Sequence, residues 1–341
     1  MAHRITIRQV AEHAGVSYQT VSRVINDKAE VTEETRARVL ASIKALNYHP
    51  SQAARALSRQ RTSVIGVVIP FDPDFLFNDP HMLWILHGID RELTLHDYSL
   101  LLCTSRYSDD PISAYQRLLN ERLVDGVIVD GTYGEAGIRL LVERGYPVVV
   151  TGYCGNGIPC VHPDDEGGAY NLAQHLIALG HRRIGVIDGP EPSRWRGFER
   201  ACRDAGLDHD PHLVVHGDHT LRSGYEAVTS LMQQPEPPTA IFAFDDKMAI
   251  GAMRWLREHG YAIPTDISVT GFDDMPTADL FDVPLTTVNL CSADLGQRAA
   301  SLLISLIEGH APGTAEIVLP TRMVVRQSTA VAPQACSSRG R

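Results

Sequence analysis

Residues 5–26 read ITIRQVAEHAGVSYQTVSRVIN, two short amphipathic stretches on either side of Gly15. Thr6 precedes apolar residues at helical spacing, Gly15 can adopt the positive φ that a tight turn requires, and Ser17 can cap the second stretch. The second stretch would turn its valines inward and leave polar side chains outward. These outward residues are Tyr18, Gln19, Ser22 and Arg23. The pattern predicts a helix-turn-helix, whose second helix meets base edges in the major groove of DNA.

A third helix is predicted from about Thr32 to Leu46. Its inner face would be formed by Val39, Leu40, Ile43 and Leu46. Pro50 then fits the first turn of a short helix over residues 51–58. So short a segment without a buried face does not stay helical alone, so it would need DNA to become ordered.

At this point the sequence resembles the lac repressor (LacI/GalR) family. The resemblance rests on V-S-Y-Q-T-V-S-R-V at 16–24, L-N-Y-x-P at 46–50 and A-x-x-L at 54–57, and it continues more loosely to about residue 329.

The resemblance implies a DNA-binding headpiece over residues 1–49 and a hinge helix with its linker over residues 50–62. Leu57 would enter the minor groove at the centre of the DNA site. The DNA-contacting residues that it implies are Thr6, Ser17, Tyr18, Gln19, Thr20, Ser22, Arg23, Asn26, Tyr48, Ala54 and Leu57.

Charge is distributed unevenly along the chain. Residues 1–61 hold ten Lys or Arg and five Asp or Glu, whereas the whole chain of 341 residues has a net charge of −10. A basic end on an acidic body favours one segment that contacts phosphate groups and a larger one that does not. The charge therefore supports double-stranded DNA as the partner of the N-terminal segment.

Composition bounds the remaining possibilities. With 44% hydrophobic residues in 341, the chain can bury more than one core. It has no run of about twenty apolar residues and no apolar signal region near its start, so we expect a cytoplasmic protein that does not span a membrane. The six cysteines form no C-x-x-C pair, so we expect reduced packing residues, with zinc or disulfides as the alternative.

From Val64 onward, apolar runs alternate with amphipathic stretches. Strands are expected at 64–69, 99–103, 126–129, 147–151, 183–187, 240–244 and 267–271. Helices are expected at 80–96, 111–122, 135–144, 165–179, 194–205, 221–233 and 246–259. Continuous apolar strands are buried on both faces, and two rounds of strand–helix alternation predict two α/β lobes with parallel sheets.

The resemblance implies how these lobes divide the chain. The core would be like that of the periplasmic binding proteins, with crossings between lobes near residues 160–163, 289–293 and 319–322. The N-terminal lobe would comprise residues 63–161 with 293–320, and the C-terminal lobe residues 162–292 with 321–330. Residues 331–341 are expected to be a disordered tail without the leucine heptads that make the lac repressor a tetramer.

Small ligands bind such folds between the lobes, where parallel strands end. Three elements after these strand ends match the family: R-x-x-G-F at 194–198, D-D-K-M-A-I-G-A at 245–252 and G-F-D-D at 271–274. The candidate ligand-binding residues are Asp72, Asp79, Arg194, His219, Asp245 and Asp273. Arg194 and Asp273 are expected on opposite sides of one ligand.

Two of these residues depart from the family. Asp245 stands where the family often has Asn, and His219 stands where the lac repressor has an aromatic residue. Carboxylates accept hydrogen bonds from vicinal hydroxyls and repel phosphate, so Asp79, Asp245 and Asp273 favour a neutral sugar or polyol as effector. A nucleobase-type corepressor is the alternative ligand. The structural alternative for each acid is a helix cap or a solvated loop residue.

Other classes of protein fit the sequence less well. It contains no G-x-S-x-G and no Walker loop, and residues 152–157 have the wrong glycine spacing for a dinucleotide fingerprint, so we expect no enzyme and no cofactor. No metal spacing links His162, His175 and His181, which are expected at the surface or at helix caps. A sugar-binding transport receptor would explain residues 63–330 but not the headpiece.

The expected function is that of a homodimeric repressor on a pseudo-palindromic operator. The effector between the lobes would set the spacing of the hinge helices, provided that it prefers one lobe arrangement.

Overall fold

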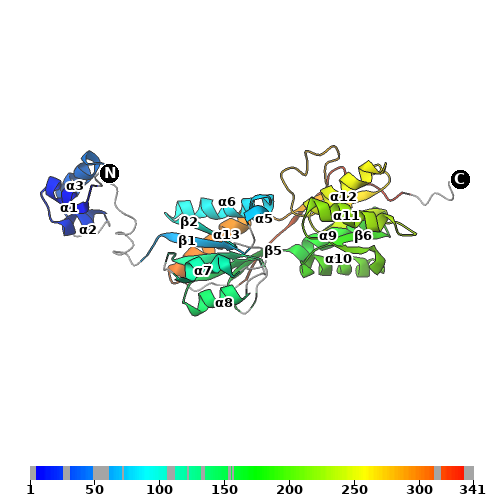
Figure 1. Cartoon of the computed structure of the whole chain (residues 1–341), viewed down its shortest axis with the longest axis horizontal. Coiled ribbons are helices and arrows are strands. Elements are labelled where there is room, and N and C mark those ends of the chain that lie inside the picture. Colours follow the sequence, from blue (N-terminus) through cyan, green and yellow to red (C-terminus); the bar gives the residue numbers. More distant parts are fainter. Residues whose placement is uncertain are drawn as a thin grey trace.

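The computed structural model describes residues 5–25, 31–48, 61–70, 73–105, 112–120, 123–131, 135–152, 155, 157–310 and 316–333. Along the longest axis, three helices at one end are followed by two α/β lobes (Figure 1). The predictions outside the described residues concern Asn26, Asp72, residues 50–60 with Ala54 and Leu57, and the tail from residue 334. No helix in the described ranges is both long and apolar enough to cross a membrane.

The caps predicted from the sequence delimit the first helices. Helix α1 spans Ile7–Ala14, α2 spans Tyr18–Ile25 and α3 spans Glu33–Ala45. Thr6 and Gln9 form a capping box at the start of α1, and Gly15 ends this helix with a φ of 65°. The Ser17 hydroxyl accepts the N–H of Thr20 at 3.1 Å and begins α2.

A small apolar core joins these three helices. Val10, Val21 and Val39 are fully buried at its centre. Leu40, which was predicted to face inward, is 51% exposed. The prediction is wrong because the inner face of α3 passes through Val39 and Ser42, which turns Leu40 toward solvent.

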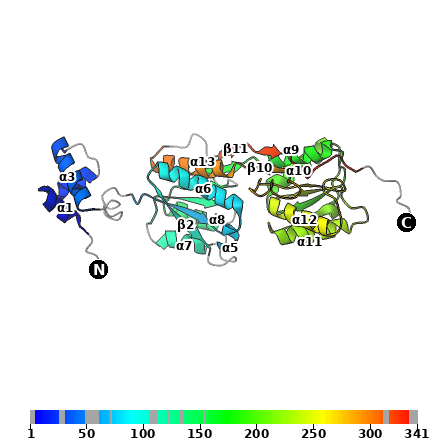
Figure 2. The ribbon, with the colours of Figure 1, turned by 90° about the horizontal axis from the view of Figure 1, so that it is seen from above.

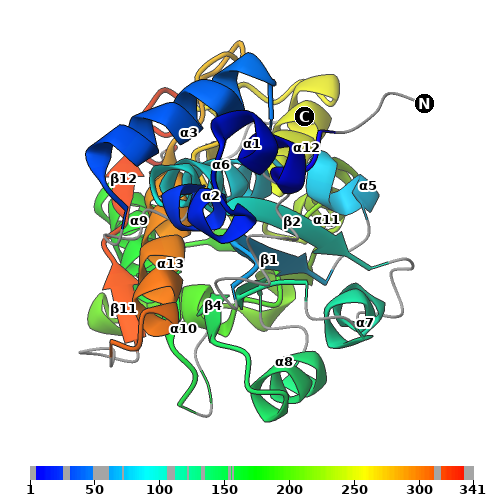
Figure 3. The same cartoon turned by 90° about the vertical axis from the view of Figure 1, so that its left-hand side faces the viewer.

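The N-terminal lobe is a six-stranded parallel sheet. In spatial order its strands are β11 (Glu316–Leu319), β5 (Cys160–Pro163), β4 (Val148–Thr151), β3 (Gly126–Asp130), β1 (Val64–Ile69) and β2 (Ser99–Thr104). Its helices are α5 (Pro73–Phe77), α6 (Pro80–Leu95), α7 (Ser113–Asn120), α8 (Glu135–Glu143) and α13 (Ser292–Ile307). Because side chains alternate along β1, Ile65 and Val67 pack in one core with α6 and α13, whereas Val68 packs in another with α7 and α8 (Figure 3).

Helices α6 and α13 pack closely because glycines let their backbones approach. A Cβ on Gly88 would lie 1.9 Å from the Ala293 carbonyl oxygen, and a Cβ on Gly296 would lie 2.0 Å from the Ile85 carbonyl oxygen. A side chain at either position would push the helices apart. Helix α13 was not predicted from the sequence, and it brings a late part of the chain back onto the N-terminal lobe.

The C-terminal lobe holds a four-stranded parallel sheet. Its strands, in spatial order, are β7 (Val214–His216), β6 (Ile184–Asp188), β8 (Ala240–Ala243) and β9 (Ser268–Thr270). Its helices are α9 (Asp165–Ala178), α10 (Pro192–Asp204), α11 (Leu221–Met232) and α12 (Asp246–Glu258), with a short 3-10 helix at Pro211–Leu213. The predicted strands and helices of this lobe agree with these bounds to within about two residues.

Within the part of the chain that the structure describes, three segments connect the lobes. The chain passes from β5 into α9, from β10 (Thr287–Asn289) into α13, and from β11 into β12 (Arg322–Val324). Strands β10 and β12 pair antiparallel to each other, and β10 and β11 lie at the junction of the lobes (Figure 2). The carboxyl ends of several strands therefore face this junction.

Two expectations about single residues are wrong. Cys160, which was expected to be reduced, is disulfide-bonded. His181, which was expected at the surface or at a cap, is fully buried, with its ring nitrogens 2.9 Å from Thr239 Oγ1 and 3.0 Å from Ser268 Oγ. These polar partners replace the hydrogen bonds that the ring would make to water, so His181 has a structural role in the core of the C-terminal lobe.

Candidate DNA-binding face and ligand cleft

Helix α2 presents its predicted reading residues outward. Tyr18 is 54% exposed, and Gln19 and Arg23 are exposed on the same helix. Of the other predicted contacts, Thr6 and Ser17 are exposed, Thr20 and Ser22 are partly buried, and Tyr48 is buried in the core of the three helices. Tyr18, Gln19 and Arg23 are therefore accessible from solvent on α2, as a base-reading surface requires.

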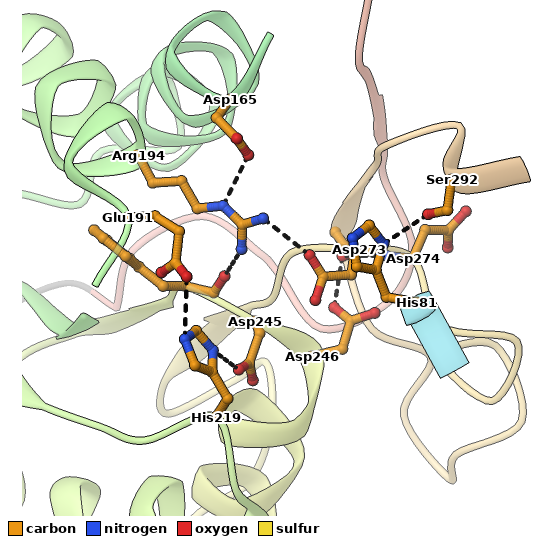
Figure 4. Close-up of polar contacts among 12 residues, drawn as sticks. His81, Asp165, Glu191, Arg194, His219, Asp245, Asp246, Asp273, Asp274 and Ser292 are labelled. Carbon is orange, nitrogen blue, oxygen red and sulfur yellow. Dashed lines mark hydrogen bonds and ion pairs between the residues drawn. The ribbon is translucent and has the colours of Figure 1, made fainter. Parts of the chain in front are cut away.

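Arg194 on α10 is the centre of a buried polar network beside the candidate ligand cleft (Figure 4). Its Nε donates to Asp165 Oδ1 at 2.9 Å, and its Nη2 donates to Asp273 Oδ1 at 3.2 Å. Its Nη1 donates to the Phe244 carbonyl, and its guanidinium lies 4.1 Å from the ring centre of Phe272. Burial opposes the charge, but the nearby carboxylates outweigh it and raise the pKa of Arg194. Arg194 therefore stays charged inside the lobe.

Arg194 and Asp273 contact each other directly. The expectation that they lie on opposite sides of a ligand is therefore wrong for this arrangement of the lobes. Burial raises the pKa of Asp273 to about 8, although Arg194 acts in the opposite direction. Asp273 also has a φ of 102°, and the next residue, Asp274, has a φ of 53°. Such backbone strain in a non-glycine residue is typical of functional sites.

Asp274 and Arg326 keep this strained turn in place. Arg326 Nη2 donates to Asp274 Oδ1 at 2.6 Å, and Asn289 Nδ2 donates to Asp274 Oδ2 at 2.7 Å. The turn is thus fixed to β10, which leads into one crossing between the lobes, and to the segment after β12, which follows another.

His219 lies between two carboxylates. Its Nδ1 is 2.6 Å from Asp245 Oδ2, and its Nε2 is 3.1 Å from Glu191 Oε1. Burial opposes the charge on the ring, but these two partners outweigh it and raise the pKa of His219 to about 10. The other oxygen of Asp245 accepts the Met248 N–H at 2.6 Å and caps α12. Asp245 is thus a helix cap as well as a member of the cluster.

We predict that His219 remains protonated well above neutral pH. Nitrogen NMR of the imidazole at pH 8 should show the imidazolium, because Asp245 and Glu191 stabilise the charged ring. Since the folded-state pKa is raised above the unfolded value near 6.5, the stabilisation is complete below about pH 6.5 and is lost as the pH rises through about 10. The stability difference between the wild type and His219→Gln should shrink over the same range, and a neutral ring at pH 8 would contradict this network.

Asp79 joins the two lobes. Its Oδ1 accepts the His81 N–H at 2.9 Å and caps α6, while Lys247 Nζ on α12 donates to its Oδ2 at 2.7 Å. Burial acts to raise the pKa of Asp79, but Lys247 outweighs it, and the pKa is lowered. Asp79, predicted as a ligand contact, is in this arrangement an ion-pair partner across the cleft.

A cavity of about 420 Å³ opens beside Asp273 at the junction of the lobes. His81 and Trp84 line it from the N-terminal lobe, and Asn289 and Ser292 line it from a crossing segment. His81 Nδ1 lies 2.7 Å from Ser292 Oγ, and burial lowers the pKa of His81, which favours the neutral ring. A neutral imidazole and a hydroxyl can both donate and accept hydrogen bonds, which suits a polar uncharged ligand.

Sequence reasoning missed several members of the cleft: Asp165, Glu191, His81 and Ser292. Glu191 follows the end of β6, so the argument from strand ends could have found it. His81 lies two residues after Asp79, which was predicted as a ligand contact. Nothing in the local sequence indicates Ser292, which reaches the cleft because of the crossing into α13.

The whole chain is similar to known bacterial regulators. Residues 6–51 match the family of bacterial regulatory proteins, lacI family, and residues 173–329 match the periplasmic binding protein-like domain. The HTH-type transcriptional repressor PurR of Haemophilus influenzae (strain PittEE) is 33% identical over 95% of this chain and 98% of its own length.

Two solved structures extend this similarity to the fold. The lac repressor dimer bound to operator and the anti-inducer ONPF has a TM-score of 0.85 and 28% identity, covering 96% of this chain and 100% of that chain. The transcriptional regulator CelR–cellobiose complex has a TM-score of 0.73 and 32% identity, covering 95% of this chain and 100% of that chain.

Proposed function

Since the chain belongs to the lacI family of bacterial regulatory proteins, and is a DNA-binding transcriptional regulator and not an enzyme, we propose that its interlobe cleft binds a small neutral effector of the sugar class. The observation that carries this proposal is the position of Asp273, which borders the cavity together with His81 of the other lobe and bonds to Arg194. A ligand hydroxyl at this place meets the carboxyl group of Asp273 and the imidazole of His81, which can each form a hydrogen bond with it.

Charge supports a neutral ligand. Around the cleft, Arg194 pairs with Asp165 and Asp273, and His219 pairs with Asp245 and Glu191. Even with Asp273 protonated below its pKa of about 8, the other three carboxylates outnumber the two cations. An anionic ligand would add charge repulsion to its desolvation cost, whereas hydroxyl groups donate to such acceptors. The CelR structure contains cellobiose, a neutral sugar, which agrees with this chemistry.

A thermal-shift screen of the purified protein tests the ligand class. The panel holds neutral mono- and disaccharides, polyols, phosphorylated sugars and purine bases. We expect a neutral sugar to raise the melting temperature, because a ligand at a hundred times its Kd stabilises the folded state by about 2.7 kcal/mol. A purine that raises it while every sugar fails would overturn the proposal in favour of a nucleobase-type corepressor.

The same proposal assigns a pseudo-palindromic operator to a homodimer, with one headpiece on each half-site. The effector regulates binding only if it prefers one arrangement of the lobes, since equal affinity for both would shift nothing. The Lys247–Asp79 ion pair supports the existence of such a preferred arrangement, because its two residues lie in different lobes and separate when the lobes move apart.

An apolar groove on the C-terminal lobe supports the homodimer. It has a volume of about 430 Å³ and is lined by Ile250, Met253, Phe281 and Val283, with Leu280 also lining it and 77% exposed. Exposed apolar surface of this kind marks a protein–protein contact. In a homodimer with twofold symmetry, the same surface of the second copy covers it, as the similarity to the lac repressor dimer suggests.

Leu280→Glu is expected to convert the dimer into a monomer, because a carboxylate buried in a mostly apolar interface loses its hydration. Arg254 and Arg257 also line the groove, but they already pair with Glu258 and Asp282. Light scattering coupled to size-exclusion chromatography at micromolar concentration measures the mass. Leu221→Glu is the matched control, since Leu221 is 53% exposed on α11 and does not line the groove. A dimeric Leu280→Glu variant would show that this groove is not the interface.

A further inference from the structure

The segment that enters the core from the headpiece is held by one carboxylate. Asp125, just before β3, accepts three hydrogen bonds from two consecutive residues of this segment. Its Oδ1 accepts the Thr62 N–H at 2.6 Å and the Thr62 hydroxyl at 2.9 Å, and its Oδ2 accepts the Ser63 N–H at 2.9 Å. Ser63 has a φ of 54°, so both amides can point at the same carboxylate.

Neighbouring contacts hold the same segment from other sides. Arg61 Nη2 donates to the Ile307 carbonyl at 3.0 Å, at the C-terminal end of α13, where a cation is favourable. The Ser99 N–H donates to the Ser63 carbonyl at 2.9 Å, and the Asp125 N–H donates to the Val64 carbonyl at 2.8 Å. Elements β2, β3 and α13 of the N-terminal lobe thus all hold residues 61–64.

We propose that Asp125 is the positioning residue that transmits the orientation of the N-terminal lobe to the DNA-binding headpiece. Within the chain, residues 61–63 are the covalent connection through which any movement of the lobe reaches the headpiece. With Asp125 in place, the connection leaves the lobe at a fixed point and in a fixed direction. Without it, residues 61–63 become a looser tether at the lobe, and the second headpiece of a dimer loses effective concentration at its half-site.

The test compares a palindromic operator with a single half-site. Asp125→Ala should weaken binding to the full operator by roughly tenfold and leave half-site binding unchanged, because only simultaneous engagement depends on the tether. Removing an acidic residue favours DNA binding electrostatically, so a loss cannot arise from charge. Asp90→Ala removes the same charge from the exposed side of α6 and should keep the wild-type ratio of full-site to half-site affinity.

A second measurement needs neither a dimer nor DNA. Hydrogen exchange of the free protein should show faster exchange of the Thr62 and Ser63 amides in Asp125→Ala than in the wild type, while the melting temperature of the core changes little. In Asp125→Asn, which keeps one acceptor oxygen, these amides should exchange at rates between those of the wild type and Asp125→Ala.

The comparison of full-operator with half-site affinity assumes the proposed dimer, whereas the hydrogen-exchange measurement does not. A wild type without any full-site advantage would count against the dimer, whereas unchanged amide exchange in Asp125→Ala would overturn the role of Asp125. The role of Asp125 would also be overturned if Asp125→Ala lost protection of the Thr62 and Ser63 amides but kept the wild-type ratio of full-site to half-site affinity.

Discussion

Arg194→Met is expected to weaken the response to effector while operator binding persists. Arg194 donates to Asp165 and Asp273 and to the Phe244 carbonyl, so its loss leaves buried acceptors without a donor. Arg194 holds Asp273 where it borders the cavity, and loss of one charged hydrogen bond costs about 1.5–3 kcal/mol, so effector binding through Asp273 should weaken by at least about tenfold. Removing one partner of a buried ion pair also costs about 3–5 kcal/mol of stability. Because the pKa of Asp273 is raised to about 8, this carboxyl is largely protonated at neutral pH, so the loss of Arg194 leaves less uncompensated charge there.

A fluorescent operator complex, titrated with the effector that the thermal-shift screen identifies, measures the response of this variant. Arg196→Met is the matched control, because Arg196 lies on the same helix, is exposed and pairs with Glu166 outside the cleft. The control should reach half of its change in operator binding at the same effector concentration as the wild type. A wild-type midpoint in Arg194→Met as well would show that the effector binds elsewhere.

The helix-turn-helix was predictable because its signals are local. Thr6, Gln9, Gly15 and Ser17 each act on backbone groups within a few residues, so the pattern needs no knowledge of distant contacts. Strand β1 occupies the residues predicted for it, because an uninterrupted apolar run of this length is buried on both faces of a parallel sheet.

Helix α13 was missed because its start carries no signal. Its N-cap is Cys291, which makes no side-chain hydrogen bond to the helix and has a φ of 53°. The buried stripe of Leu295, Ala299 and Leu303 is present in the sequence. Without a capping residue, this stripe does not stand out from the preceding β10 and crossing segment.

The general place of the cleft followed from strand ends, but its contacts did not. His219 and Asp245 are 26 residues apart, and Asp79 and Lys247 are 168 residues apart. Each pair forms only when two elements or two lobes come together. Local sequence therefore indicates which side chains are available for the cleft, and the fold decides whether they face a ligand or each other.

Arg23→Ala is expected to weaken binding to the specific operator by about 1–3 kcal/mol, or roughly five- to 150-fold. Arg23 is exposed on α2 on the same helix as Tyr18 and Gln19, where a recognition helix meets base edges. An arginine there can donate two hydrogen bonds to one guanine, and an alanine leaves both acceptors unpaired. Non-specific binding depends on phosphate contacts instead, so it should fall much less.

Gel-shift titrations on operator and on random DNA at the same salt concentration separate these two effects. Arg38→Ala is the matched control, because Arg38 is exposed on α3 and carries the same charge away from the reading helix. Arg38→Ala should weaken binding to operator and to random DNA alike, or leave both affinities unchanged, since a phosphate contact carries no sequence information. If Arg23→Ala also weakened operator and random DNA equally, Arg23 would contact phosphate, and base recognition would have to come from Tyr18 and Gln19.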